Sequence, residues 1–87
     1  MADTLGLLEE AMQLARDVGY AVREEALGDA PGGACTVGGR RQILVNAALP
    51  AAERLELLLD ILAVEPGAAG QPTSRLLAGH LARRRSG

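Results

Sequence analysis

The sequence PAAERLELLLDILAV, from Pro50 to Val64, predicts a helix that is apolar around most of its circumference. Its aliphatic residues leave only a narrow polar strip, made of Glu53, Glu56 and Asp60. A surface helix normally has one apolar stripe, so a helix of this kind is covered on several sides. We therefore expect residues 50–64 to form a central packing helix, with Pro50 in its first turn, where a missing N–H costs nothing.

This helix has more apolar surface than the few other predicted elements can cover, which predicts self-association. The chain has 87 residues, with one Tyr and no Phe or Trp, so its core must be built from small aliphatic contacts. A domain of this size and composition is stabilised by a partner or by a second copy of itself. The residues we assign to such an interface are Leu57, Leu59, Ile61 and Val64.

The N-terminal part predicts a helix followed by a strand. The helix begins at Asp3 or Thr4, whose side chains can cap it, and ends at Gly19 in a left-handed conformation. Its buried half is predicted to contain Leu5, Leu8, Ala11, Met12, Ala15 and Val18, with Leu7 and Leu14 at the edge. Residues 20–25 then alternate with period two, which predicts a strand with Tyr20 and Val22 facing inward.

Residues 34–46 predict a hairpin that turns at Gly38-Gly39, after a loop over residues 28–33. Two registers are open. A two-residue turn places Cys35 on the face of Gln42 and Leu44, whereas a three-residue turn places it with Ile43 and Val45. The second gathers more apolar area on one face and is favoured, which makes Cys35 a small core residue.

The C-terminal part predicts a flexible connector and a last helix. Residues 66–72 are rich in Pro and Gly, and a helix follows over residues 74–84, capped by Thr73 or Ser74. The predicted fold is therefore α+β, in the order α-β-β-β-α-α, with helices covering a three-stranded antiparallel sheet. It comprises a compact domain over residues 1–65, the connector over residues 66–72, and a C-terminal helix with an Arg-rich tail over residues 73–87.

Charge is distributed unevenly along the chain. Residues 1–65 hold eleven acidic residues and five Arg, whereas residues 66–87 hold four Arg and no acidic residue. The basic tail can lie across the acidic body, stay in solvent, or dock on an acidic surface elsewhere. Arg83, Arg84 and Arg85 are the residues assigned to such a tail contact. A net charge of −2 and the lack of stacking aromatics argue against a nucleic-acid partner.

The sequence contains no group of residues suited to catalysis or to metal binding. His80 and Cys35 are the only residues of their types, and neither stands within a cluster of potential ligands or a catalytic relay. The glycines do not follow a phosphate-loop spacing. We therefore predict no catalytic residue, no metal and no cofactor.

Three features of the sequence indicate a location. The single Cys fits a reducing compartment, acidic residues interrupt any N-terminal signal, and residues 57–64 are too short to cross a bilayer. The expected location is the cytoplasm, with no membrane association.

The segment from Leu8 to Ala63 resembles the ImmA/IrrE-type minimal zincins. Residues 15–24 (ARDVGYAVRE) are similar to the helix-to-strand opening of that family, and residues 33–36 and 43–50 to its hairpin and the entry to its metal-binding helix. That family carries His-Glu-x-x-His on the next helix, whereas residues 58–65 (LLDILAVE) contain no His. The resemblance implies a remnant without peptidase activity, and no functional residue carries over. Small bacterial proteins with a Gly-Gly-x-Cys hairpin are an equally close comparison.

Two functions follow as predictions. The first is a non-enzymatic interaction or structural module of the bacterial cytosol, a homodimer formed through the helix over residues 50–64. The alternative is an inactive zincin-like remnant that binds a peptide along the hairpin edge without hydrolysing it.

Overall fold

The computed structural model describes residues 3–86. In chain order the elements are α1 (Thr4–Asp17), β1 (Ala21–Glu25), β2 (Gly32–Val37), β3 (Arg40–Asn46), α2 (Ala51–Ala63), the 3-10 helix η1 (Pro66–Gly70) and α3 (Arg75–Ser86). The predicted α+β class and the order of helices and strands are confirmed. The connector is not an unstructured segment, because η1 occupies most of it and buries Ala68 against the helices.

The sheet is mixed, so the prediction of a purely antiparallel sheet was wrong. Its strand order is β1-β3-β2, with β2 antiparallel and β1 parallel to β3. The central position goes to β3, which is the most deeply buried strand, since its Ile43 and Val45 are fully buried. After β1 the chain therefore crosses to the far edge of the sheet, where it forms β2. It then returns as β3 between the two, parallel to β1.

The hairpin has the two-residue turn, so the favoured three-residue register was wrong. Val37 pairs with Arg40, and Gly38 and Gly39 both have positive φ, at 58° and 80°. A turn with two such residues matches the twist of the flanking strands, and this geometry outweighs the extra apolar area of the other register. As a result Cys35 pairs with Gln42 and is exposed rather than part of the core.

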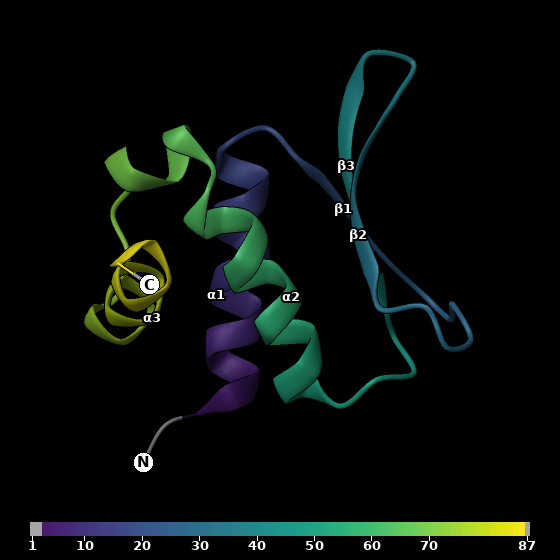
Figure 1. Cartoon of the computed structure of the whole chain (residues 1–87), viewed down its shortest axis with the longest axis horizontal. Coiled ribbons are helices and arrows are strands. Elements are labelled where there is room, and N and C mark those ends of the chain that lie inside the picture. Colours follow the sequence, from purple (N-terminus) through teal and green to yellow (C-terminus); the bar gives the residue numbers. More distant parts are fainter. Residues whose placement is uncertain (1–2, 87) are drawn as a thin grey trace.

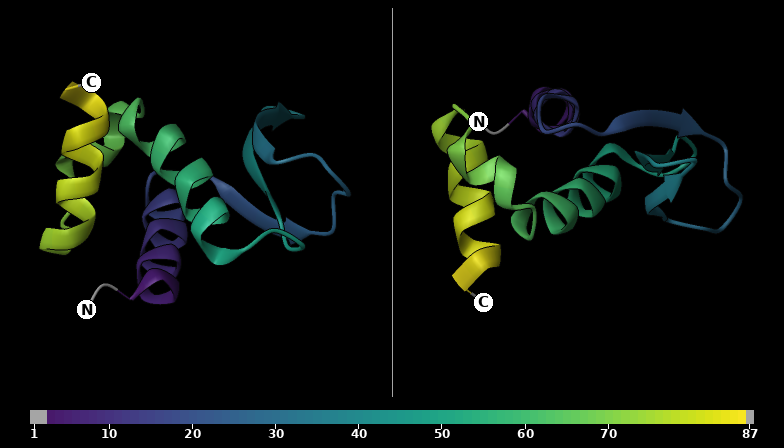
Figure 2. Two further views of the ribbon diagram at one scale, coloured as in Figure 1. Left: turned by 60° about the horizontal axis from the view of Figure 1, so that its bottom comes forward. Right: turned by 90° about the horizontal axis from the view of Figure 1, so that it is seen from above.

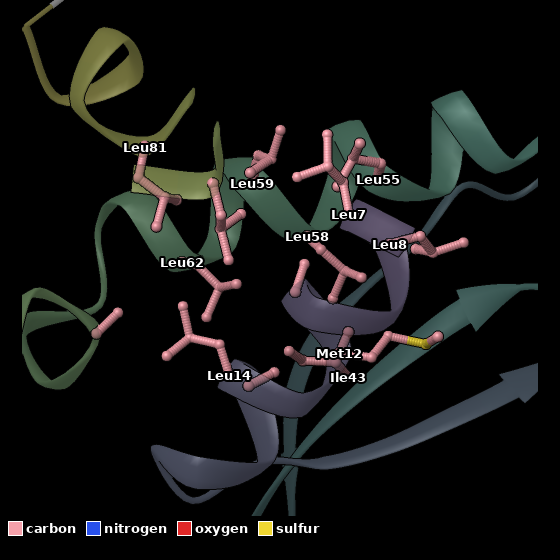
Figure 3. Close-up of a cluster of buried hydrophobic side chains, with 14 of the residues drawn as sticks. Leu7, Leu8, Met12, Leu14, Ile43, Leu55, Leu58, Leu59, Leu62 and Leu81 are labelled. Atoms are coloured by element: carbon pink, nitrogen blue, oxygen red, sulfur yellow. The ribbon is translucent and has the colours of Figure 1, made fainter. Parts of the chain in front are cut away.

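The elements form three layers. In Figures 1 and 2 the sheet lies on one side of the paired helices α1 and α2, and α3 lies on their other side. Figure 3 shows the side chains from these layers meeting in one aliphatic cluster. The C-terminal helix therefore packs on its own chain, through Leu77 and Leu81.

The central helix α2 is covered within the chain. Four of its leucines are buried between α1, α3 and the sheet: Leu55, Leu58, Leu59 and Leu62. Two aliphatic residues, Leu57 and Ile61, are half-buried. The expectation that this helix packs on several sides is confirmed, and intrachain contacts provide most of the cover.

The buried face of α1 is rotated from its predicted position. Leu7 and Leu14 are buried, whereas Leu5 is 60% exposed. The reason is that α1 contacts α3 as well as α2 and β1, so its buried arc extends beyond a single-sided stripe. The helix ends as predicted, since Gly19 follows it with a φ of 105°. Asp3 occupies the N-cap position, but its side chain makes no capping hydrogen bond.

Polar contacts connect the layers at their margins. Ser74 caps α3 by accepting a hydrogen bond from the Leu77 N–H, and it donates to Glu10 of α1 from both its N–H and its hydroxyl. Arg54 of α2 donates to the Leu49 carbonyl and pairs with Glu24 of β1. These contacts set the orientation of α3 and of the sheet on the central helices.

Candidate functional site

A surface cleft of about 390 Å³ lies where the C-terminal end of α1 meets the start of the sheet. We call it the arginine cleft, and it is lined by Arg16, Gly19, Tyr20, Ala21, Gly39, Arg40 and Arg41. It exists because β3 begins at Arg40, whereas β1 begins at Ala21, opposite Gln42. The first residues of β3 therefore have no strand partner on that side. Figure 1 shows the hairpin extending past the start of β1.

One wall of the arginine cleft is a stacked and ion-paired group. The Arg41 guanidinium lies 4.0 Å from the centroid of the Tyr20 ring, and it pairs with the Glu65 carboxylate. Glu65 also accepts a hydrogen bond from the Gly67 N–H at 3.0 Å. Because this N–H and the Arg41 guanidinium both favour the ionised carboxylate, they hold the pKa of Glu65 below its ordinary value. The start of β3 is thus fixed to the start of η1.

The other two guanidinium groups of the cleft have no partner within the described part of the chain. Arg16 and Arg40 are exposed, and within residues 3–86 neither makes a hydrogen bond or an ion pair through its side chain. Like Arg41 they carry a permanent positive charge and planar donor groups suited to oxyanions. This lining therefore favours an anionic ligand.

The two edges of the sheet differ in charge. β1 presents Arg23, Glu24 and Glu25, and charged side chains discourage a further strand from pairing at an edge. β2 reads Gly-Gly-Ala-Cys-Thr-Val and has no charge and no Pro. Both strands pair only with β3 within the described part of the chain. The edge of β2 is thus open to another strand and lacks the usual protection.

The four residues predicted to form an interface on α2 differ in their exposure to solvent. Leu59 is only 1% exposed, so it is a core residue of the single chain and offers no surface to a partner. Leu57 and Ile61 are half-buried, and Val64 is 81% exposed. Since Val64 follows the helix as its C-cap, the accessible members do not form a continuous apolar face along α2.

The predicted tail residues lie on α3, and their side chains contact α2 and α3 of the same chain. Arg84 pairs with Glu56 and Asp60, so it covers the acidic strip of α2. Arg85 donates to the Ala63 carbonyl at 3.2 Å. Arg83 contacts the Nδ1 atom of His80 at 3.1 Å. The sequence left open whether the basic segment lies across the acidic body, stays in solvent or docks elsewhere. In the structure it lies across the acidic body.

Asn46 is a structural residue that sequence reasoning missed. Its side chain is fully buried at the end of β3, where its Nδ2 donates to the carbonyls of Gly28 and Ala30 at 2.9 and 2.8 Å. Its Oδ1 accepts from the N–H groups of Leu27 and Ala48. The loop before β2 is thus anchored to the sheet. The available signal was an Asn that directly follows the apolar run Ile43-Leu44-Val45.

Within residues 3–86 no three His, Cys, Asp or Glu side chains come together in a way suited to a metal ion. None of the helices in this part of the chain combines the length and the apolar character that crossing a bilayer requires.

Comparisons of the chain with protein-family models, curated proteins and solved structures found no match. The resemblance to minimal zincins therefore stays a prediction. The two surfaces described above, the arginine cleft and the edge of β2, are the candidate sites.

Proposed function

We propose that the chain is a non-enzymatic protein-interaction module of the bacterial cytosol that self-associates through the outer edge of β2. The observation that carries this proposal is the contrast between the two sheet edges. An unpaired strand edge exposes N–H and C=O groups that another strand can satisfy, and only β2 lacks charges that oppose it.

A second copy of the chain suits this edge because β2 can pair with itself. Two β2 strands related by a twofold axis run antiparallel, and a pairing centred on Cys35 places the two Cys35 residues opposite each other. The two sheets then continue as one, with the helices of both copies on the same side. The four residues Ala34, Cys35, Thr36 and Val37 are exposed and uncharged, so no repulsion opposes this pairing.

The proposal moves the self-association surface from the helix to the strand. Leu59 is covered within the chain, which removes it from the interface predicted on α2. A small aliphatic core still supports the expectation of a partner, because a chain of this size buries a limited fraction of its surface alone.

Sedimentation equilibrium from low to high micromolar concentration tests this proposal. We expect a dimer of the 9.0 kDa chain that dissociates on dilution. Cys35→Lys places two like charges opposite each other at the centre of the pairing, and we expect it to weaken the dimer by about tenfold or more. Circular dichroism checks that this variant keeps its fold, as the exposure of Cys35 leads us to expect.

Two control variants isolate the cause. Cys35→Ser removes the thiol without adding charge, and we expect its dimer to match that of the wild type. Gln71→Lys adds the same charge on an exposed loop far in sequence from β2, and it too should leave the dimer unchanged. A wild-type chain that stays monomeric at high concentration, or a Cys35→Lys dimer of undiminished strength, contradicts the proposal.

The same edge favours one alternative, a remnant that pairs β2 with an extended peptide of another protein. It predicts a monomer whose β2 amides become protected from hydrogen exchange when uncharged peptides are added. The sedimentation experiment separates the two functions. Self-association gives a dimer of the chain alone, whereas the alternative requires an added peptide.

A further inference from the structure

We propose that the arginine cleft is a binding site for the phosphate group of a small phosphate monoester. The site lies on the β1 side of the sheet, across β3 from the edge of β2, and it is independent of the proposed self-association.

The charge of the lining is the first argument. Arg16, Arg40 and Arg41 all line the cleft, and among residues 3–86 no acidic residue does so. Glu65 neutralises Arg41 through its ion pair, which leaves the charges of Arg16 and Arg40 unbalanced locally. A phosphate monoester carries a charge of about −1.5 to −2 at neutral pH, so it matches two free guanidinium groups better than a carboxylate does.

The main chain at the end of α1 opposes an anion less than the C-terminal end of a helix usually does. The C-terminal end of a helix usually presents free carbonyl groups, whose partial negative charge repels anions. At the end of α1, however, three of the carbonyls are engaged in hydrogen bonds. Those of Leu14, Ala15 and Arg16 accept hydrogen bonds from the N–H groups of the next residues, Val18, Tyr20 and Gly19. These hydrogen bonds reduce the repulsion at this helix end, and the arginines supply the charge of the lining.

The position of the free arginines is the third argument. Arg16 comes from the last turn of α1, and Arg40 is the first residue of β3, so the two belong to different elements that border one cleft. Arg41, the third arginine of the lining, is stacked on Tyr20 and paired with Glu65, which gives the cleft a fixed wall. A phosphate contacted from both sides loses less binding energy to side-chain ordering when part of the site is preorganised.

The size of the cleft indicates a ligand larger than the phosphate group alone. Its volume of about 390 Å³ falls in the range of small-molecule sites. The uncharged lining of Gly19, Tyr20, Ala21 and Gly39 leaves room for an organic part next to the phosphate.

A titration followed by amide NMR tests the proposal with three probes at low ionic strength: adenosine 5′-monophosphate, inorganic phosphate and adenosine. We expect saturable binding of the first two, tighter for the monophosphate, with amide shifts centred on Gly19, Ala21, Gly39 and Arg40. Adenosine should cause no saturable shift there, because it lacks the charged group. Equal binding of adenosine and its monophosphate would overturn the proposal.

Variants assign the effect to the cleft. The double variant Arg16→Gln, Arg40→Gln should weaken binding of the monophosphate by at least tenfold, and its unchanged amide spectrum away from the cleft shows that it is folded. Arg75→Gln removes an exposed arginine on α3 and should leave the affinity unchanged. Undiminished binding by the double variant, or shifts centred on Arg83 to Arg85, would assign the phosphate to general attraction by basic residues. Cys35→Lys should retain phosphate binding, so failure of either proposal leaves the other testable.

Discussion

The central helix α2 and the outer half of the hairpin, residues 34–41, are built on opposite principles. α2 buries four leucines among α1, α3 and the sheet. In residues 34–41 every residue is exposed, and the strands are held mainly by their pairing with each other. The first region carries the aliphatic core, and the second carries an open strand edge and part of the arginine cleft.

This difference shows where the chain has surface available for binding. Burial in the helical layers commits side chains to stability, since loss of buried aliphatic volume is costly. The outer hairpin contributes little apolar burial, so its side chains can change at low cost to the fold. Both proposed sites include residues of this hairpin.

The largest expected effect is a loss of stability on truncating the core of α2. Leu58 is 0% exposed, and replacing it with Ala removes contacts to the facing layers and leaves a cavity. We expect Leu58→Ala to lower the free energy of unfolding by about 2–5 kcal/mol, measured by urea denaturation. The matched truncation Val37→Ala, at a residue 57% exposed on β2, should cost about 0.5 kcal/mol or less. Similar costs for the two variants would break the comparison.

The next effect concerns the polar anchor at the end of β3, where Asn46 holds the loop before β2. Asn46→Asp keeps the shape of the side chain but turns its donor toward the carbonyls of Gly28 and Ala30 into an acceptor. We expect a loss of about 2–3 kcal/mol at neutral pH, because a buried carboxylate then faces two carbonyl oxygens. Acidification should recover part of the loss in urea denaturation, since the protonated side chain regains one donor. A variant as stable as the wild type would show that the loop is held by other contacts.

The elements followed from the sequence more closely than their arrangement did. Periodicity located α2 and α1, and Gly38-Gly39 located the turn. The strand order depends on which strand is most buried. Burial is a property of the packed layers, and the burial of Ile43 and Val45 becomes evident only in the structure. The arginine cleft joins Arg16 to Arg40 across the parallel pairing of β1 and β3, which the sequence did not predict. The prediction placed Leu59 in an interface because the apolar face of α3 is thin. The packing of α3 on α2 therefore could not be inferred from the sequence.

A smaller effect is expected from the ion pair that ties the outer hairpin to η1. Contacts with the Gly67 N–H and Arg41 lower the pKa of Glu65 in the folded state below its ordinary value of 4.5. Its contribution to stability is therefore complete well above pH 4.5 and is lost as the pH falls through the lowered folded-state pKa. We expect Glu65→Gln to reduce the Tm at pH 7, with a gap to the wild type that closes in acid. A gap independent of pH would show that the charge of Glu65 does not stabilise the fold.

The smallest expected effect is on the reactivity of Cys35, which no longer counts as a core residue. Its exposure predicts that iodoacetamide alkylates the folded, dilute protein at close to the rate for the urea-unfolded chain, with no change in Tm on Cys35→Ser. If the edges of β2 pair, the opposing strand shields this thiol, and the rate should fall as protein concentration rises through the dimer transition. Alkylation that is slow even in dilute solution would mean that the outer hairpin is covered within one chain, which contradicts the contrast between the two regions.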